Sequence, residues 1–195
     1  MPTTEEKTPS SQDDEGRLKD LAASVESAID NPTYVLTKDI EQHNPETVWK
    51  ALSTPGLLME MHPLIVDVQV IQRQEGDDGT IKGILDVTDQ LEFLCGLVKS
   101  KTTYRAYMHC SPPKANAEPA SGTRKIYFQT STMGTTVSTR IDCEPANATG
   151  TTVTQTTFIT APFGLRRYVQ QTARMAHEGS LESLPSILDK LSSGS

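Results

Sequence analysis

The pattern of hydrophobic positions changes from strand-like to helical near residue 162. Residues 66–161 are rich in Thr, Val, Ile and Tyr and are interrupted by Gly and Pro, as is typical of short strands joined by turns. From Pro162 to Leu191 the apolar residues recur at helical spacing instead. This order predicts a curved antiparallel sheet with one long helix across its face.

Seven strands are predicted from the alternation and the turn residues between them. Their expected ranges are 34–40, 66–75, 80–88, 98–111, 124–132, 135–144 and 151–161. Residues 76–79 (Gly-Asp-Asp-Gly) and the pair Met133-Gly134 indicate two hairpin turns. Strands and helices do not alternate, so a parallel sheet is not expected.

Two short helices are predicted between the first and second strands. Asn44 is a suitable cap for the first, because Pro45 follows at the first helical position and an acid in the first turn. The breaker residues 53–56 separate this helix from a second one over 57–61. The fold class is therefore α+β.

The N-terminal segment divides into two parts. Residues 1–14 are polar and acidic and are expected to be a disordered tail. Residues 15–31 carry apolar residues at three- and four-residue intervals and predict a helical arm, which packs on the domain or on a second copy. The main domain is expected to span residues 34–191.

The C-terminal segment predicts a helix over about 163–191. Its proposed inner stripe includes Tyr168, Thr172 and Met175, and a kink is expected near Pro185. Between strand and helix, residues 162–165 (Pro-Phe-Gly-Leu) are a candidate gate, with a plain turn as the alternative.

Composition narrows the classes of partner. The formal charge of −7 argues against binding to nucleic acid or an anionic membrane, since both are negative. No apolar stretch is long enough to span a bilayer, so no stable membrane insertion is expected, and the N-terminus lacks a secretory pattern. Three widely spaced cysteines suit the reducing cytosol, so a cytoplasmic location is expected.

The order of elements resembles the helix-grip fold of the SRPBCC superfamily, which includes START domains, Bet v 1-type proteins, hormone receptors and bacterial aromatic polyketide cyclases. The likeness rests on residues 44–53, on residues 59–63 leading into the next strand, and on the terminal helix. More narrowly, residues 86–89 and 103–106 resemble uncharacterised fungal members. The resemblance implies a cavity between the sheet and the helix, and leaves carriers, receptors and enzymes open.

No cofactor or metal motif accompanies this fold. The four histidines lie on different predicted elements without an HxH or HExxH spacing, which makes a metal site improbable on the pattern alone. Neither a GxGxxG sequence after a strand nor a GxSxG elbow is present. We therefore expect no metal, no nucleotide cofactor and no hydrolase chemistry.

Strand alternation and the helical stripe select twelve candidate ligand-binding residues that would face the cavity. These are Leu85, Val87, Thr102, Ala106, Met108, Phe128, Thr139, Ile141, Phe163, Tyr168, Thr172 and Met175. Simple core packing is the alternative interpretation of each of them.

Three side chains are candidate catalytic groups. Tyr104 could act as an acid, with a packed core tyrosine as the alternative. Glu92 stands in an apolar sequence that would raise its pKa, unless it lies in a surface loop. His62, at a helix-to-strand junction, could be an acid or base or a structural turn histidine.

The other charged residues of the strands have simpler interpretations. Asp86 and Asp89 are adequately explained as turn or exposed edge residues. Arg105, Arg124 and Arg140 are expected on the outer face, although one that points inward would bind a carboxylate or phenolate.

The sequence favours a cofactor-free cyclase, isomerase or lyase that acts on a hydrophobic small molecule in natural-product biosynthesis. A non-catalytic carrier of a lipid, sterol or pigment is the alternative, and it needs only an apolar cavity. A protein-interaction module would account for the acidic arm but not for the cavity. Apolar residues in the arm make a homodimer a further expectation.

Overall fold

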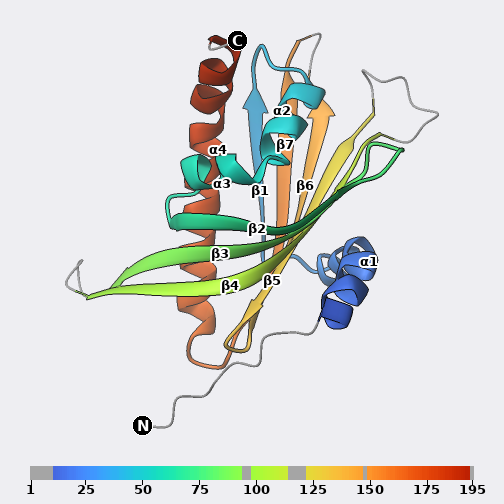
Figure 1. Cartoon of the computed structure of the whole chain (residues 1–195). Helices are drawn as coiled ribbons and strands as arrows, with labels where there is room; N and C mark the ends of the chain where they lie inside the picture. The colour runs from blue at the N-terminus through green and yellow to red at the C-terminus, as the bar shows by residue number, and fades with distance from the viewer. Residues whose placement is uncertain (1–10, 94–97, 114–121, 147–148, 194–195) are drawn as a thin grey trace.

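A computed structural model of the chain describes residues 11–93, 98–113, 122–146 and 149–193. Side chains of residues 11–12, 91–93 and 98–99 lie outside this description as well. Within it, a single sheet is covered by helices on both faces (Figure 1). Residues 1–10 of the tail predicted over residues 1–14 lie outside the described residues, whereas residues 11–14 are helical.

The sheet has seven antiparallel strands in the order β1-β7-β6-β5-β4-β3-β2. They are β1 (Tyr34–Ile40), β2 (Ile65–Glu75), β3 (Ile81–Phe93), β4 (Val98–Ser111), β5 (Arg124–Thr132), β6 (Thr135–Pro145) and β7 (Thr151–Thr160). Each predicted strand is found within two residues of its expected bounds, except that β3 continues to Phe93. The extension forms because residues 89–93 continue to pair with β4.

Four helices complete the described part of the chain. They are α1 (Ser11–Ala28), α2 (Pro45–Leu52), α3 (Pro55–Met61) and α4 (Arg166–Ser193). Asn44 caps α2 as predicted, accepting a hydrogen bond from the backbone N–H of Thr47. The α+β helix-grip fold expected from the sequence is therefore confirmed.

The concave face of the sheet holds the main core. Helices α2 and α3 and the C-terminal half of α4 pack there, around buried residues such as Val48, Met108, Ile126 and Leu184. Leu85, Val87 and Ala106 form a smaller apolar cluster on the same face, nearer the β2 edge. The concave face thus carries two apolar clusters: the main core beneath the helices, and the smaller cluster of Leu85, Val87 and Ala106 beside it.

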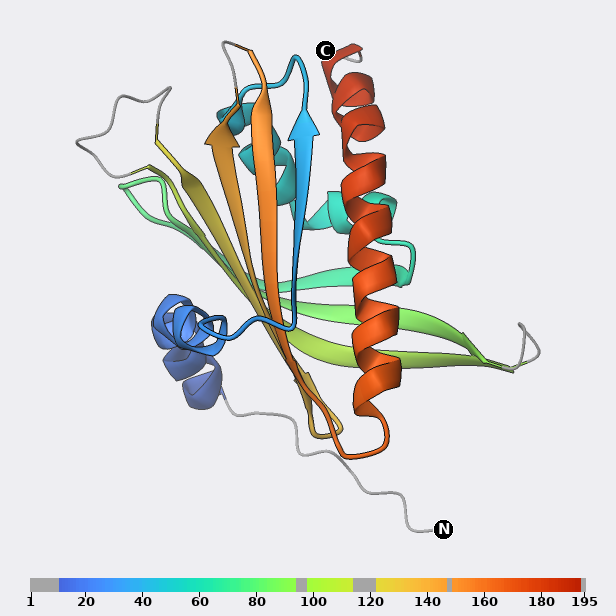
Figure 2. The same ribbon diagram turned by 180° about the vertical axis from the view of Figure 1, so that it is seen from behind.

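Helix α1 covers the opposite, convex face (Figure 2). Leu21 and Val25 pack there against Ile84, Tyr107 and Tyr127. The helix spans Ser11–Ala28 rather than residues 15–31, and Asp14 in its first turn contacts Arg105 and Tyr107 of the sheet. The apolar face of the arm is therefore buried on its own chain.

Helix α4 is anchored through its C-terminal half. Its buried residues are Ala176, Leu181, Leu184, Ile187 and Leu188, and the helix continues through Pro185 as expected. It begins only at Arg166 because Gly164 adopts a positive φ of 91° and the N–H of Leu165 closes a turn onto Pro162. No helix in the described part of the chain combines the length and apolar character that crossing a membrane requires.

Candidate functional site

An acidic residue and a tyrosine form a partly buried pair on the concave face. The hydroxyl of Tyr104 on β4 donates to Oδ2 of Asp89 on β3 at 2.9 Å. The other carboxyl oxygen of Asp89, Oδ1, is buried and has no hydrogen-bond partner among the described residues. Burial raises the pKa of Asp89 despite the opposing effect of the Tyr104 hydrogen bond, and it also raises the pKa of Tyr104.

This pair revises the interpretation of Asp89. The sequence pattern favoured a turn or an exposed strand edge, but β3 runs past this residue to Phe93. The register places Asp89 opposite Thr102, and Val87 opposite Tyr104, so all four share the concave face. Asp89 was missed because the predicted strand ended at residue 88.

A second polar cluster brings together three elements beside α4. The hydroxyl of Tyr34 on β1 lies 2.8 Å from Nδ1 of His177 on α4. The ring of His177 packs edge-on against His62, at the end of α3, with 5.8 Å between the ring centroids. Nδ1 of His62 is buried and, like Oδ1 of Asp89, lacks a hydrogen-bond partner among the described residues.

Both histidines of this cluster are held in the neutral form. Burial lowers the pKa of His62 to about 4, because the charged imidazolium loses its hydration there. Burial, with a smaller contribution from His62, lowers the pKa of His177 to about 3. At neutral pH each ring therefore offers one donor and one acceptor nitrogen.

His62 links the second cluster to the strand segments that hold Asp89. Ile65, at the start of β2, is the register partner of Asp89, and the N–H of Gln90 donates to the carbonyl of Leu64. His62 precedes Ile65 by three residues, and its backbone carbonyl accepts from the N–H of Ile65. The unpartnered atoms of Asp89 and His62 thus come from neighbouring segments.

The strand residues predicted to bind a ligand lie on the concave face, and most are buried. Leu85, Val87, Ala106 and Met108 are almost fully covered. Thr139 and Ile141 are buried as well, and the hydroxyls of Thr139 and Thr157 lie 3.2 Å apart. Thr102 and Phe128 keep part of their surface accessible.

The predicted residues around α4 are placed differently. Phe163 is fully exposed, Tyr168 is 43% exposed and Met175 is 71% exposed, while Thr172 is partly buried. The inward side of the helix instead passes through Val169, Ala173, Ala176, His177 and Ser180, as their burial shows. The expected stripe was rotated, because its apolar members Tyr168 and Met175 lie almost opposite His177 at 100° per residue.

Glu92 cannot be placed in the site. Its backbone belongs to β3 and pairs with Lys99, but its side chain lies outside the described residues. His177 and Tyr34, by contrast, join the site without having been singled out. Only their long-range contact brings them there, and the sequence offers no local signal for it.

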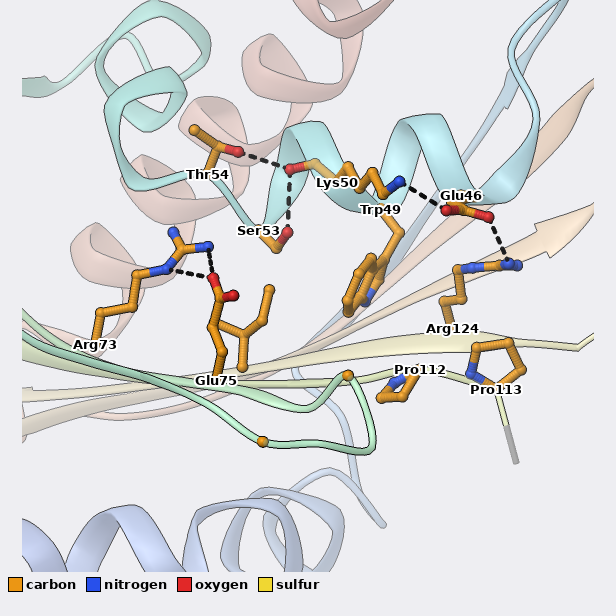
Figure 3. A pocket seen from close by; sticks show the side chains of 13 residues that line it. Glu46, Trp49, Lys50, Ser53, Thr54, Arg73, Glu75, Pro112, Pro113 and Arg124 are labelled. Carbon is orange, nitrogen blue, oxygen red and sulfur yellow. Dashed lines mark hydrogen bonds and ion pairs between the residues drawn. The ribbon is translucent and has the colours of Figure 1, made fainter. Parts of the chain in front are cut away.

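A hollow lies between α2 and the β2–β3 hairpin, at the end of the concave face away from Asp89 (Figure 3). Its volume is about 710 Å³. Its lining contains none of the residues predicted to bind a ligand. The lining residues are Glu46, Trp49, Lys50, Ser53, Thr54, Arg73, Glu75, Gly76, Gly79, Ile81, Pro112, Pro113 and Arg124.

The three strand arginines divide between the faces. Arg105 and Arg140 lie on the convex face as expected, where Arg105 binds Asp86 and Asp14, both at 2.7 Å. Arg124 is only 5% exposed and lines the hollow, where it approaches Glu46 at 3.6 Å. Arg124 therefore points inward rather than lying on the outer face, and the carboxylate beside it belongs to Glu46 of the protein itself.

Across the described residues, no group of three or more His, Cys, Asp or Glu side chains is arranged to hold a metal ion. Cys110 and Cys143 are buried free thiols, and burial raises the pKa of both. Neither thiol is therefore prepared to act as a nucleophile near neutral pH. Cys95 lies outside the described residues.

No family model and no curated protein matches this sequence. Solved structures do match its fold. A START superfamily protein from Mycobacterium smegmatis has a TM-score of 0.52 at 13% identity, over 80% of this chain and 98% of that one. The Zhui aromatase/cyclase from Streptomyces sp. R1128 has a TM-score of 0.51 at 11% identity, over 80% and 94%.

A di-domain aromatase/cyclase, StfQ from the steffimycin biosynthetic pathway, is similar over 88% of this chain but only 56% of its own length. Its TM-score is 0.54 at 12% identity. At such identities the likeness is one of fold alone. The chain therefore has the helix-grip fold found in START superfamily and polyketide aromatase/cyclase proteins.

Proposed function

We propose that this protein binds a hydrophobic small molecule on its concave face and acts on it as a cofactor-independent cyclase or isomerase in natural-product biosynthesis. The observation that carries the proposal is the Asp89–Tyr104 pair beside the apolar cluster of Leu85, Val87 and Ala106. The fold shared with two aromatase/cyclases supports the same class of reaction.

The pair is suited to proton transfer. Tyr104 holds Oδ2 of Asp89, while the buried Oδ1 has no hydrogen-bond partner among the described residues. A carboxylate whose pKa is raised by burial is a stronger base than an ordinary aspartate, and a larger share of it carries a proton at a given pH, so the same group can also act as the acid. Asp89 is therefore the proposed general base and acid.

An intramolecular aldol closure shows how such a pair would work. Oδ1 of Asp89 takes a proton from the carbon beside a ketone, and the C–H electron pair forms the enolate. The enolate carbon attacks a second carbonyl of the same molecule and forms the ring bond. The resulting alkoxide takes the proton back from Asp89, which restores the carboxylate. Neutral His62 can orient a carbonyl or hydroxyl through Nδ1.

A carrier of a lipid, sterol or pigment is the second candidate function. It is favoured by the apolar character of the concave face around Val87 and Ala106, and by histidines that stay neutral. A carrier would need Asp89 only to hold a polar group of its cargo.

Mass spectrometry of small molecules extracted from the purified protein and from Asp89→Asn separates these functions. If the protein is an enzyme, Asp89→Asn retains an unreacted precursor that wild-type protein converts when the two are mixed. Asp86→Asn is the matched control, because Asp86 lies on the same strand but faces Arg105 on the convex side. Identical, unconverted cargo in all three proteins would establish the carrier and contradict the enzyme.

A further inference from the structure

One end of the molecule carries exposed apolar side chains at the tips of two neighbouring turns. The β5–β6 hairpin presents Met133, which is 75% exposed, and the segment between β7 and α4 presents the fully exposed Phe163. The turns are adjacent, because a Cβ added to Gly134 would stand 3.5 Å from Cγ of Pro162. Figure 1 and Figure 2 show both at the end opposite the C-terminus of α4. Packing does not account for an aromatic side chain at this position.

The apolar surface continues along the first half of α4. Leu165 is 55% exposed just before the helix, and Met175 is 71% exposed within it. Tyr168 lies between them on the same side, because it is about one helical turn from Leu165 and two from Met175. This side faces away from the core, since the inward side passes through His177. We refer to these apolar residues as the α4-start patch: Met133, Phe163, Leu165, Tyr168 and Met175.

Arginines border the patch, and acids are missing from the segments that form it. Residues 131–137 and 158–177 contain no Asp or Glu. Arg166 and Arg167 follow directly on the exposed turn and are themselves exposed. The N-terminus of the 28-residue helix α4 adds partial positive charge at the same place. These segments are therefore positively charged.

The acids of adjoining elements do not cancel this charge. Glu178 on α4 pairs with Arg174 at 2.8 Å. The acids at the start of α1 lie on the convex face, across the sheet from α4, and Asp14 there binds Arg105. Asp30 lies in the segment that enters β1, and its charge offsets only one of the two exposed arginines.

The charge of −7 for the whole chain, which argued against binding to an anionic membrane, does not describe this end. At physiological ionic strength the Debye length is about 8 Å, so charges farther than that from the patch are largely screened. An approaching anionic surface therefore meets mainly the local arginines.

The combination of projecting apolar side chains and arginines suits a lipid surface. Apolar side chains on protruding turns can enter the boundary between headgroups and acyl chains, whereas a protein partner would need a matching groove. Guanidinium groups beside them can bind lipid phosphates. A second copy of the chain is disfavoured, because it would bring two arginine-bordered patches together.

We propose that the α4-start patch docks the protein reversibly on the surface of an anionic phospholipid bilayer. Phe163, Leu165 and Met133 enter the interface, and Arg166 and Arg167 bind headgroup phosphates. Docking of this kind is peripheral and involves no spanning segment. It does not depend on the function proposed for the concave face.

Co-sedimentation of the whole chain with lipid vesicles tests the proposal. The vesicles consist of phosphatidylcholine alone, or of phosphatidylcholine with about 30% phosphatidylserine, in about 0.15 M salt. We expect roughly fivefold tighter binding to the mixed vesicles than to the neutral ones, and weaker binding to them as the salt concentration is raised. Equal binding to both, or binding to neither, would overturn the proposal.

Two variants test the apolar and the charged component separately. Phe163→Ser should weaken binding to the mixed vesicles about tenfold, because it removes a side chain that enters the interface. Arg167→Gln should weaken the same binding about fivefold and leave binding to neutral vesicles unchanged. The matched controls are Val70→Ser, a half-exposed apolar residue on β2, and Lys19→Gln, an exposed cation on α1. Losses in the controls as large as those in the variants would refute the assignment to this patch.

Sedimentation without lipid shows whether a second copy covers the patch instead. A wild-type dimer that Phe163→Ser converts to a monomer, with no vesicle binding by either, would make the patch an interface between copies and disprove membrane docking. Asp89→Asn should bind vesicles as the wild type does. Failure of docking and failure of the concave-face function are therefore observed separately.

Discussion

At the scale of single residues, the two oxygens of Asp89 have different surroundings. Oδ2 accepts from Tyr104, whereas the buried Oδ1 has no partner among the described residues. A half-satisfied buried carboxylate costs stability, because it loses hydration without full replacement. A buried carboxyl with one unpaired oxygen is not what stability alone would favour. Departures of this kind are found mainly at functional sites.

Asp89→Asn should reveal this cost through its pH dependence. The folded-state pKa of Asp89 is raised, so the wild type loses the stability contributed by this group as the pH rises through that pKa. The amide has no charge to bury, so the variant should gain stability relative to wild type between pH 4 and pH 7. Urea unfolding at both pH values measures the difference. Asp86→Asn should instead lose stability at pH 7, because it breaks the contact with Arg105; a parallel loss in both variants would contradict the prediction.

At the scale of elements, α1 is tied to the sheet by polar contacts at both ends. Near its start, Asp14 accepts from the hydroxyl of Tyr107 at 2.6 Å and binds Arg105 at 2.7 Å. Near its end, Glu26 accepts from Tyr127 and Arg140 at 2.8 and 2.6 Å. These contacts place the helix on its own convex face. The apolar residues of the arm, which were the reason for expecting a dimer, are thus covered by the sheet of the same chain.

Leu21→Ala should show how strongly α1 contributes to the fold. Leu21 is 1% exposed, so its truncation leaves a cavity against the sheet and should cost about 2–4 kcal/mol in the free energy of unfolding. Chemical denaturation measures this loss. Leu191→Ala on α4 is the control, since that leucine is 45% exposed and should cost less than about 1 kcal/mol. Equal losses would show that α1 is not part of the cooperative unit.

At the scale of the whole molecule, the cluster of Tyr34, His177 and His62 joins three elements. It connects β1 at one sheet edge, the middle of α4, and the α3–β2 junction. Gly179 of α4 lies close to Pro63 at the same place, where an added Cβ would stand 3.5 Å from that ring. Protonation of this cluster would place charge where the helix meets the rest of the protein.

The cluster predicts that acid destabilises the protein in a defined range. Both histidines have folded-state pKa values below the ordinary 6.5, so stability is present above that pH and is lost as the pH falls towards 4 and 3. For His62 alone the loss amounts to roughly 3 kcal/mol. His62→Gln should therefore flatten the decline in urea-unfolding free energy between pH 6.5 and 4. If the profiles of variant and wild type run parallel, His62 is not the titrating group.

The sequence predicted the elements well because their signals are local. Asn44 and Pro45 mark a helix start, and Met133 and Gly134 mark a turn in which both adopt positive φ. Alternation along β4 correctly placed Tyr104 and Ala106 on one face and Arg105 and Tyr107 on the other. These features depend on neighbours within a few residues, so the chain itself specifies strands, turns and face assignments.

Tertiary structure decided how those elements meet. The rotation of α4, which turns His177 inward and Met175 outward, depends on the core beneath its distant C-terminal half. The pairing of Asp89 with Tyr104 depends on how far β3 and β4 stay in register. The hollow between α2 and the β2–β3 hairpin needs residues from β2 and β5 opposite α2. Such contacts join segments far apart in the chain, and no local pattern encodes the relative placement of distant surfaces.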